Sequence, residues 1–377
     1  MASATPPDGV RIAYDDCDFT PPWEIAKPMA PRFRMAPRQF SRCLLLLTFL
    51  LSSISALAAD QTKITLVQSS YSFNFVPLDI ARTEGYFADE GLDVDVVLAG
   101  GGPKTMTALL GGGGQFSASV LLDGIMAHRK GLDDVRALAT LALAYNPVVI
   151  RADVAKQRGM SMDIPLKQRV TAMKGLRIAI TTPGASSDMV VRYLALTNGL
   201  SPDRDLQIVP LGSVPAQIAG LRAGQVDGCA CLPGVDTLTK QEGLTVDMVR
   251  GSEMGDLDGI TYGTLYGLAS YDKAHPEIVR AVARAVTRAT LLIASDPERA
   301  KRATRPFFKQ MDEATFDESW KLYLPYFPKT PDITQSDYDK ELAFEKVVLP
   351  SNVYKPVPYD EAVDTSFVRA AMKELAH

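Results

Sequence analysis

The sequence predicts an α/β protein of two similar lobes, each with a parallel-dominated sheet. Short apolar runs alternate with helix-like segments in a βαβαβ order, which is typical of parallel strands covered by helices. This order occurs twice along the chain. The chain has 377 residues, of which 46% are hydrophobic and 22% charged, so it has the composition of a globular protein and is long enough for two domains.

The first βαβαβ unit follows from its apolar runs, prolines and glycines. Pro77 suits the first turn of a helix, and glycine-rich segments follow the predicted elements. We expect a strand at 63–69, a helix at 77–84, a strand at 93–98, a helix at 103–110 and a strand at 115–121. Because right-handed crossovers place all strand-to-helix loops at the carboxyl ends of the strands, these loops should meet at one edge of the sheet.

The second unit repeats the pattern. Its expected elements are a strand at 176–181, a helix at 187–198, a strand at 206–211, a helix at 214–223 and a strand at 226–231. A weak internal repeat aligns Leu109 with Leu221 and Gly112 with Gly224. The aligned residues belong to the same element of each unit, which favours two similar lobes.

Two segments are expected to join the lobes and to form a two-strand hinge. Residues 137–151 are interpreted as the passage into the second lobe, and the glycine-rich segment 255–267 as the return. Further helices are expected at 276–294, 296–306, 313–324 and 361–375. The predicted division is 60–143 for the first part of lobe 1, 144–262 for lobe 2, and 263–377 for the second part of lobe 1 with the C-terminal helices.

Residues 1–59 are interpreted as an upstream extension followed by a signal peptide that is removed. Arginines precede the apolar run that begins at Cys43, and the run ends in Ala56-Leu57-Ala58-Ala59, which has the form of a cleavage site. We expect the true start at Met35, or alternatively at Met29, because signal peptides are usually short. The apolar run is shorter than the roughly 20 residues that cross a bilayer. The mature protein is therefore expected to be exported to the periplasm.

Composition argues against several functions. The formal net charge of −4 disfavours a nucleic-acid partner, which prefers a basic face. Only three histidines are present, and they are scattered, so neither a catalytic nor a metal-binding histidine cluster is expected, and no cofactor is predicted. Cys229 and Cys231 share one face of a predicted strand. They are interpreted as buried structural thiols rather than as a disulfide or metal ligands.

Two segments resemble a known family. Residues 85–94 (GYFADEGLDV) and 223–228 (AGQVDG), the latter followed by Leu232-Pro233, are similar to segments of periplasmic solute-binding proteins of ABC transporters, of the nitrate/sulfonate/taurine (NMT1/THI5-like) type. The resemblance covers residues 63–307. It implies a two-lobed periplasmic-binding-protein fold (type II) that closes on a small-molecule ligand. It also implies delivery to membrane permease and ATPase subunits; we expect a monomer.

By position, the resemblance implies ligand-binding loops after three strands. The predicted ligand-binding residues are Ser70, Tyr71, Phe73, Asn74, Gly101, Gly102, Tyr145, Thr182, Gly184, Ala185, Ser186, Ser187, Asp227 and Tyr262. In the first loop an aromatic ring would cover a ligand face while Asn74 hydrogen-bonds it; alternatively the aromatics belong to the core. The glycines Gly101 and Gly102 would let backbone amides approach a ligand, or would simply form a turn.

The loop at 181–187 is the most informative segment. It lies between a predicted strand and a helix start, where backbone N–H groups and hydroxyls meet the positive end of a helix dipole. This arrangement suits a small anionic or carbonyl-bearing molecule. Alternatively, or in addition, Ser186 or Ser187 caps the helix. Asp227 would contact a ligand amine or fix a turn, and Tyr145 and Tyr262 would line the cleft at the two crossings.

We therefore expect an extracytoplasmic solute-binding subunit that holds a sulfonate, a carboxylate or a pyrimidine-like ring. No nucleophile stands beside a base in the predicted loops, so an enzyme is not expected. Two alternatives stay open: an enzyme similar to the pyrimidine synthases of the same family, and a periplasmic sensor subunit with the same fold.

Overall fold

The computed structural model describes residues 61–145, 147–231, 234–249, 253–257 and 259–376. The chain divides into two units, Met1–Ala58 and Ala59–His377, and all described residues belong to the second. The predicted upstream extension, the signal peptide and the start at Met35 lie outside the described residues. Within the described part, no helix has both the length and the apolarity needed to span a bilayer.

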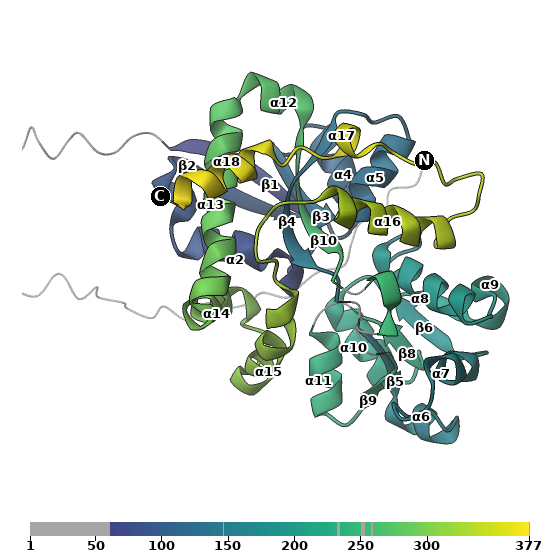
Figure 1. Cartoon of the computed structure of the whole chain (residues 1–377). Coiled ribbons are helices and arrows are strands. Elements are labelled where there is room, and N and C mark those ends of the chain that lie inside the picture. The colour runs from purple at the N-terminus through teal and green to yellow at the C-terminus, as the bar shows by residue number, and fades with distance from the viewer. Residues whose placement is uncertain (1–60, 146, 232–233, 250–252, 258, 377) are drawn as a thin grey trace, which may run out of the picture. The chain divides into compact units, whose positions relative to one another are not determined.

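The first sheet has five strands in the order β2-β1-β3-β10-β4 (Figure 1). Strand β1 is parallel to β2 and β3, whereas β10 is antiparallel to β3 and β4. The strands are β1 (Thr62–Gln68), β2 (Leu92–Leu98), β3 (Phe116–Val120), β4 (Val135–Leu143) and β10 (Thr261–Leu268). Helices α2 (Val76–Thr83) and α4 (Gly102–Leu110) connect the parallel strands, as predicted.

The second sheet repeats this plan in the order β7-β6-β8-β5-β9. Strand β6 is parallel to β7 and β8, and β5 is antiparallel to β8 and β9. The strands are β5 (Val148–Arg151), β6 (Arg177–Ile180), β7 (Gln207–Pro210), β8 (Gly228–Ala230) and β9 (Thr245–Asp247), and the connecting helices are α8 (Ser186–Thr197) and α10 (Val214–Arg222). The weak repeat falls on α4 and α10, where Leu109 and Leu221 are both fully buried.

The predicted α/β class with two sheets is thus confirmed. Parallel strands form one part of each sheet, and an antiparallel strand next to a crossing between the sheets joins it: β10 pairs with β3 in the first sheet and β5 with β8 in the second. The chain passes between the sheets twice, from β4 to β5 and from β9 to β10, in agreement with the two predicted crossings.

Several helices were not predicted. The strand expected to reach residue 121 ends at Val120, and α5 (Leu121–Arg129) follows without a break. The described part also contains α11 (Val235–Gln241) and α16 (Gln335–Val348). The side chains of Thr334 and Asp337 form a capping box at the start of α16. This Thr-x-x-Asp pattern could have predicted the start of the helix from the sequence.

The remaining helices are α3 (Tyr86–Asp89), α6 (Ala152–Gln157), α7 (Leu166–Ala172), α9 (Pro202–Asp205), α12 (Ala269–Ala274), α13 (Pro276–Ser295), α14 (Pro297–Thr304), α15 (Glu313–Tyr323), α17 (Tyr359–Ala362) and α18 (Ser366–Leu375). Of these, the helices at 276–295, 297–304, 313–323 and 366–375 lie where helices were predicted, and the one at 359–362 overlaps the last predicted helix, whereas the five at 86–89, 152–157, 166–172, 202–205 and 269–274 were not predicted. The single helix expected at 361–375 is interrupted, because Val363 forms an isolated parallel bridge with Ala137.

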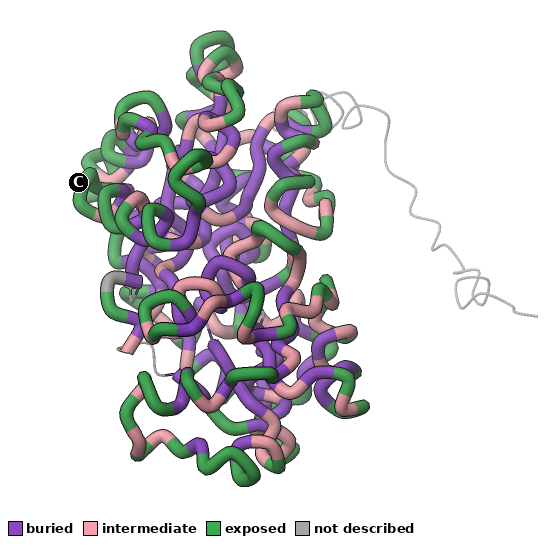
Figure 2. Tube along the Cα trace, turned by 90° about the vertical axis from the view of Figure 1, so that its right-hand side faces the viewer, coloured by how far each residue is buried: buried purple, intermediate pink, exposed green. Residues whose placement is uncertain are grey.

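Each sheet has its own hydrophobic core, and buried residues run through the interior of the fold (Figure 2). The core of the first sheet includes an aromatic cluster. The ring of Phe73 lies 4.5 Å from that of Phe308 and 4.8 Å from that of Tyr323, measured between centroids. Phe73 is fully buried, whereas Tyr71, two residues earlier in the same loop, is 40% exposed.

This contrast predicts different effects of two matched substitutions. Phe73→Ala should lower the free energy of unfolding by about 3–5 kcal/mol, because it removes a large buried ring and leaves a cavity. Tyr71→Ala should cost about 1 kcal/mol or less, since the side chain is 40% exposed and its removal leaves no closed cavity. Urea denaturation of both variants measures the two values. Equal losses would show that Phe73 does not belong to the core.

Helix α2 carries a buried acid. Asp79 is 2% exposed, and its Oδ2 atom has no hydrogen-bond partner among the described residues. Burial raises the pKa of Asp79 to about 8, although Arg82, one turn further on, acts in the opposite direction. The folded protein therefore holds this carboxyl largely in its protonated form at neutral pH.

The raised pKa has a definite consequence for stability. Because the folded state binds the proton more tightly than the unfolded state, the native protein should lose stability as pH rises from about 4 towards about 8. Asp79→Asn removes this titration. The variant should gain about 2–3 kcal/mol relative to the native protein between pH 5 and pH 7. Denaturant unfolding at both pH values measures the gain, and a difference that is constant with pH would contradict the assignment.

Candidate functional site

A pocket of about 720 Å³ lies at the carboxyl ends of six strands. Its walls come from the loops after β1, β2 and β3 of the first sheet and β6, β7 and β8 of the second. Ligands of open α/β folds bind at this edge of a sheet. Among the predicted residues, those that line the pocket are Ser70, Tyr71, Asn74, Gly101, Gly102, Tyr145, Thr182, Ala185, Ser186, Ser187 and Tyr262.

The loop after β1 divides its side chains between pocket and core. Ser70, Tyr71 and Asn74 line the pocket, while Phe73 belongs to the aromatic cluster of the core and lies outside the lining. The side-chain amide of Gln68 donates a hydrogen bond to the carbonyl oxygen of Ser70 at 2.6 Å, which fixes the start of the loop. One aromatic residue of this loop thus borders the pocket and another belongs to the core.

The glycine loop after β2 packs against an acid that the sequence analysis did not single out. A Cβ atom at Gly102 would lie 1.9 Å from Oδ2 of Asp123, so only glycine fits at this position. Asp123 lies in the first turn of α5, is 6% exposed and lines the pocket. Asp123 is the third residue of α5, a position where acids often cap the start of a helix. This position was the sequence feature from which α5 could have been predicted.

Hydrogen bonds hold the Asp123 carboxylate in place. The hydroxyl of Ser119 donates to Oδ2, and the backbone N–H of Val120 donates to the same oxygen at 3.3 Å. Burial raises the pKa of Asp123 to about 6, and these two donors oppose the shift. At neutral pH the group is therefore mostly ionised.

The loop after β6 satisfies much of its own hydrogen bonding. Ser187 Oγ accepts a hydrogen bond from the backbone N–H of Thr181 at 3.0 Å, and the N–H of Gly184 donates to Asp188 Oδ2 at 2.8 Å. Helix α8 starts after Ala185 without a side-chain cap, so neither Ser186 nor Ser187 caps it. The Asp188 carboxylate instead places a negative charge in the first turn, where it offsets the positive end of the helix dipole.

Gly184 lies in this loop but outside the lining. Its backbone φ of +77° explains the glycine, because other residues rarely adopt this conformation.

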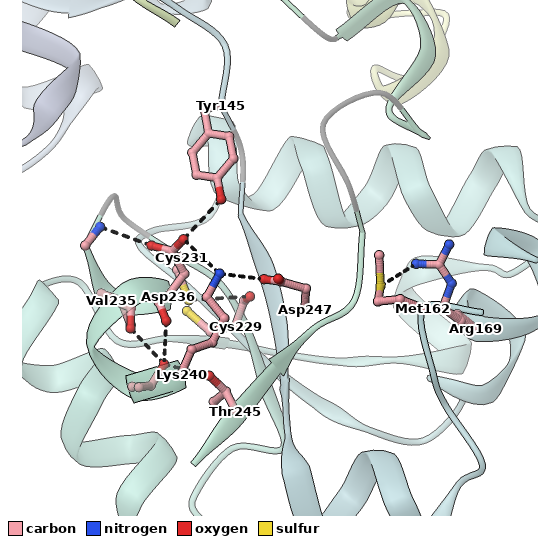
Figure 3. A network of polar contacts seen from close by, with 12 residues as sticks. Tyr145, Met162, Arg169, Cys229, Cys231, Val235, Asp236, Lys240, Thr245 and Asp247 are labelled. Atoms are coloured by element: carbon pink, nitrogen blue, oxygen red, sulfur yellow. Dashed lines mark hydrogen bonds and ion pairs between the residues drawn. The ribbon is translucent and has the colours of Figure 1, made fainter. Parts of the chain in front are cut away.

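Two tyrosines at the crossings line the pocket and are hydrogen-bonded to helices of the second sheet. The Tyr262 hydroxyl donates to Ser186 Oγ at 2.7 Å, and the Tyr145 hydroxyl donates to Asp236 Oδ2 at 3.1 Å (Figure 3). Burial raises the pKa of Asp236, and Lys240 acts against that shift. Lys240 Nζ lies 3.8 Å from Asp236 and 2.9 Å from Asp247, so the acid behind Tyr145 has a basic partner.

Asp227 lies away from the pocket lining and stabilises the second sheet. Its carboxylate accepts two hydrogen bonds from the Arg177 guanidinium, at 3.0 and 2.6 Å, and one from the backbone N–H of Arg177 at 2.8 Å. These three hydrogen bonds from Arg177 place Asp227 at the start of β6, whereas the pocket lies at the carboxyl end of that strand. The geometry corresponds to the structural alternative that the sequence left open.

The two cysteines are free and buried. Cys231 lines the pocket, and its Sγ lies 3.6 Å from the carbonyl oxygen of Cys229. Burial raises the pKa of the Cys231 thiol well above its usual value, so the thiol is a poor nucleophile. Within the part of the chain that the structure describes, no group of three or more His, Cys, Asp or Glu side chains is arranged to hold a metal ion.

The lining combines hydroxyls, aromatic rings and one carboxylate. Of the described residues that line the pocket, Asp123 is the only acid, and none is Lys, Arg or His. Several lining residues come from segments that the sequence analysis did not connect with the site. These are Phe75, Leu98, Ser119, Val120, Asp123, Pro147, Val190, Leu211, Gly212, Ser213, Val214, Pro215, Ala230, Cys231, Phe307 and Gln310.

Known proteins of similar sequence include both binding proteins and pyrimidine phosphate synthases. YtlA of Bacillus subtilis, provisionally named a binding protein, is 21% identical over 335 residues, which cover 86% of this chain and 95% of YtlA. The nitrate/nitrite binding protein NrtA of a Nostoc species is 29% identical over 189 residues, which cover 45% of this chain but only 42% of NrtA. The 4-amino-5-hydroxymethyl-2-methylpyrimidine phosphate synthase THI13 of Saccharomyces cerevisiae is 23% identical, with 72% of this chain and 78% of the synthase covered.

Solved structures share the fold. A protein of Bordetella bronchiseptica has a TM-score of 0.73 at 21% identity, with 84% of this chain and 99% of that chain covered. The alkanesulfonate-binding protein SsuA of Xanthomonas axonopodis, solved with bound MOPS, has a TM-score of 0.64 at 18% identity, with 81% and 99% covered. The profile of the NMT1-like family matches residues 71–305 of this sequence. The chain therefore belongs to the NMT1-like family.

Proposed function

We propose that the chain is the extracytoplasmic solute-binding subunit of an ABC importer and that it holds a small organic solute in the described pocket. The observation that carries the proposal is the convergence of six strand ends from two similar sheets on one cavity. Family membership supports it, because relatives are named for binding nitrate, bicarbonate or sulfonates. A sulfonate, a carboxylate and a pyrimidine-like ring are the solute classes considered.

Solute binding would use both sheets. Ser70 and Asn74 offer a hydroxyl and an amide from the first sheet, and Thr182 and Ser187 offer hydroxyls from the second. A solute that contacts both sides binds a closed arrangement more tightly than an open one, and this difference in affinity drives closure. In this proposal the lobes are 60–143 with 263–377, and 144–262, and they hinge at the two crossings.

The partners follow from the same proposal. The segment 1–59 would direct export to the periplasm and be removed, and the mature monomer would deliver its solute to membrane permease and ATPase subunits. A periplasmic sensor that uses the same fold would bind its solute equally well but would dock on a receptor instead. Loss of uptake of the solute in a deletion strain separates transport from sensing.

An enzyme is the second candidate, because the yeast synthase covers most of this chain. The pocket chemistry favours binding over catalysis. The Cys231 thiol is held in its protonated form by burial, and its neighbours in the lining include no histidine among the described residues. A nucleophile without a base and without a lowered pKa is poorly activated.

A bulky substitution tests the pocket. Ser70→Trp should fill the cavity from the loop after β1 and remove the solute that the protein, expressed from its full-length gene and exported, carries after purification. Ser351→Trp makes the same chemical change at an exposed turn and should retain the solute. Native mass spectrometry, followed by identification of the molecule released on unfolding, measures occupancy. A solute at 100 times its Kd should stabilise the native protein by about 2.7 kcal/mol, and Ser70→Trp should remove this gain.

Two results would contradict the proposal. One is a Ser70→Trp protein that still carries and responds to the solute, which would place binding elsewhere. The other is conversion of the bound molecule during incubation with the native protein, which would favour the enzyme.

A further inference from the structure

The pocket wall contains a buried carboxylate with an unused oxygen. Asp123 is 94% buried, and its Oδ2 accepts the hydrogen bonds from Ser119 and Val120. Its Oδ1 accepts no hydrogen bond from another described residue, and the side chain borders the cavity. Because a buried carboxylate gains stability from a nearby positive charge or N–H donor, this oxygen would favour such a group in a molecule that enters the cavity.

The surroundings of Asp123 do not supply that compensation. No ion pair joins Asp123 to a basic side chain of the described residues, and Lys130, just beyond the end of α5, exerts only the weakest of the influences on it. The other titratable groups around it are Tyr262 and Tyr266 of β10 and Glu341 of α16. Burial raises the pKa of all three, and none of them carries a positive charge.

Aromatic rings complete the same environment. The described lining contains the rings of Tyr71, Phe75, Tyr145, Tyr262 and Phe307. Ring faces carry negative partial charge and attract cations, and rings also stack on flat ligands. A lining that contains one carboxylate and several aromatic rings, with no base among its described residues, favours a positively charged solute.

We propose that the solute carries a positively charged or N–H-donating nitrogen group that binds Oδ1 of Asp123, with a flat apolar part between the aromatic rings. This inference rests on the proposed solute-binding function and narrows its solute class. An anion would meet the Asp123 charge at close range, where like charges repel. At the start of α8, the Gly184 N–H already donates to the Asp188 carboxylate, which also pairs with Arg192, so this donor is not free for an anion.

Three probes with a common phenyl ring and different charge test the inference. They are benzamidinium, benzoate and benzenesulfonate, and isothermal titration calorimetry or ligand-observed NMR on the protein, expressed from its full-length gene and exported, measures their affinities at pH 7.5. Benzamidinium should bind at least about tenfold more tightly than either anion, because only it can pair with the carboxylate.

A matched pair of variants assigns the preference to one residue. Asp123→Asn keeps the shape and an acceptor for Ser119 and Val120 but removes the charge, so it should weaken benzamidinium binding about tenfold. Asp79→Asn makes the same substitution at another buried carboxyl, which lies on α2 outside the pocket lining, and should leave all three affinities unchanged.

The native protein provides an independent readout. Lowering the pH from 7.5 to 5 protonates Asp123, whose pKa is about 6, and should weaken benzamidinium binding about tenfold. The Asp123→Asn protein should show no such pH dependence. Tighter binding of benzoate or benzenesulfonate than of benzamidinium, or equal binding of benzamidinium to native and Asp123→Asn proteins, overturns the inference.

The two proposals fail differently. If an anion binds and Ser70→Trp abolishes its binding, the pocket holds solutes but the proposed solute class is wrong. If none of the three probes binds and the purified native protein carries no solute, the binding function and the inference are both overturned.

Discussion

The pocket depends on the packing of the Asp123 carboxylate against the Cα atom of Gly102. Because a Cβ atom at position 102 would lie 1.9 Å from Oδ2, glycine is what lets α4 begin beside the end of β3. The same carboxylate accepts the Val120 N–H at the start of α5. One contact thus joins two helix starts and one strand end, and it leaves an acidic oxygen at the cavity wall.

Local patterns predicted the elements that repeat with a clear period. The parallel strands and the helices α2, α4, α8, α10 and α13 follow from apolar periodicity, prolines and glycines. The antiparallel strands were harder, because β10 pairs with β3 across more than 140 residues and no local pattern indicates its partner. Helix α5 was missed since its apolar start continues β3 without a turn, and α16 since the prolines before it hid its capping box.

The parts of the pocket that could be predicted are those in which a single loop directly follows a strand. The loops after β1, β2 and β6 were located from the order of strands and helices, but division of roles within a loop was not. Phe73 and Tyr71 are close in sequence and similar in chemistry, yet only packing against Phe308 and Tyr323 makes one of them core. Phe307 and Gln310 reach the pocket from beyond α14, and Asp123 acts through geometry that its sequence neighbours do not reveal.

A cavity with aromatic rings, one carboxylate and no base among its described lining residues would explain how a member of a family with anion-binding relatives takes a different solute. A crystal structure of the protein with the solute that it carries from the cell tests this account most directly. The account predicts a nitrogen atom of the solute within hydrogen-bond distance of Asp123 Oδ1, with further contacts to Ser70 and Ser187. A solute outside this cavity, or an anionic group held at the start of α8 with Asp123 unoccupied, would contradict it.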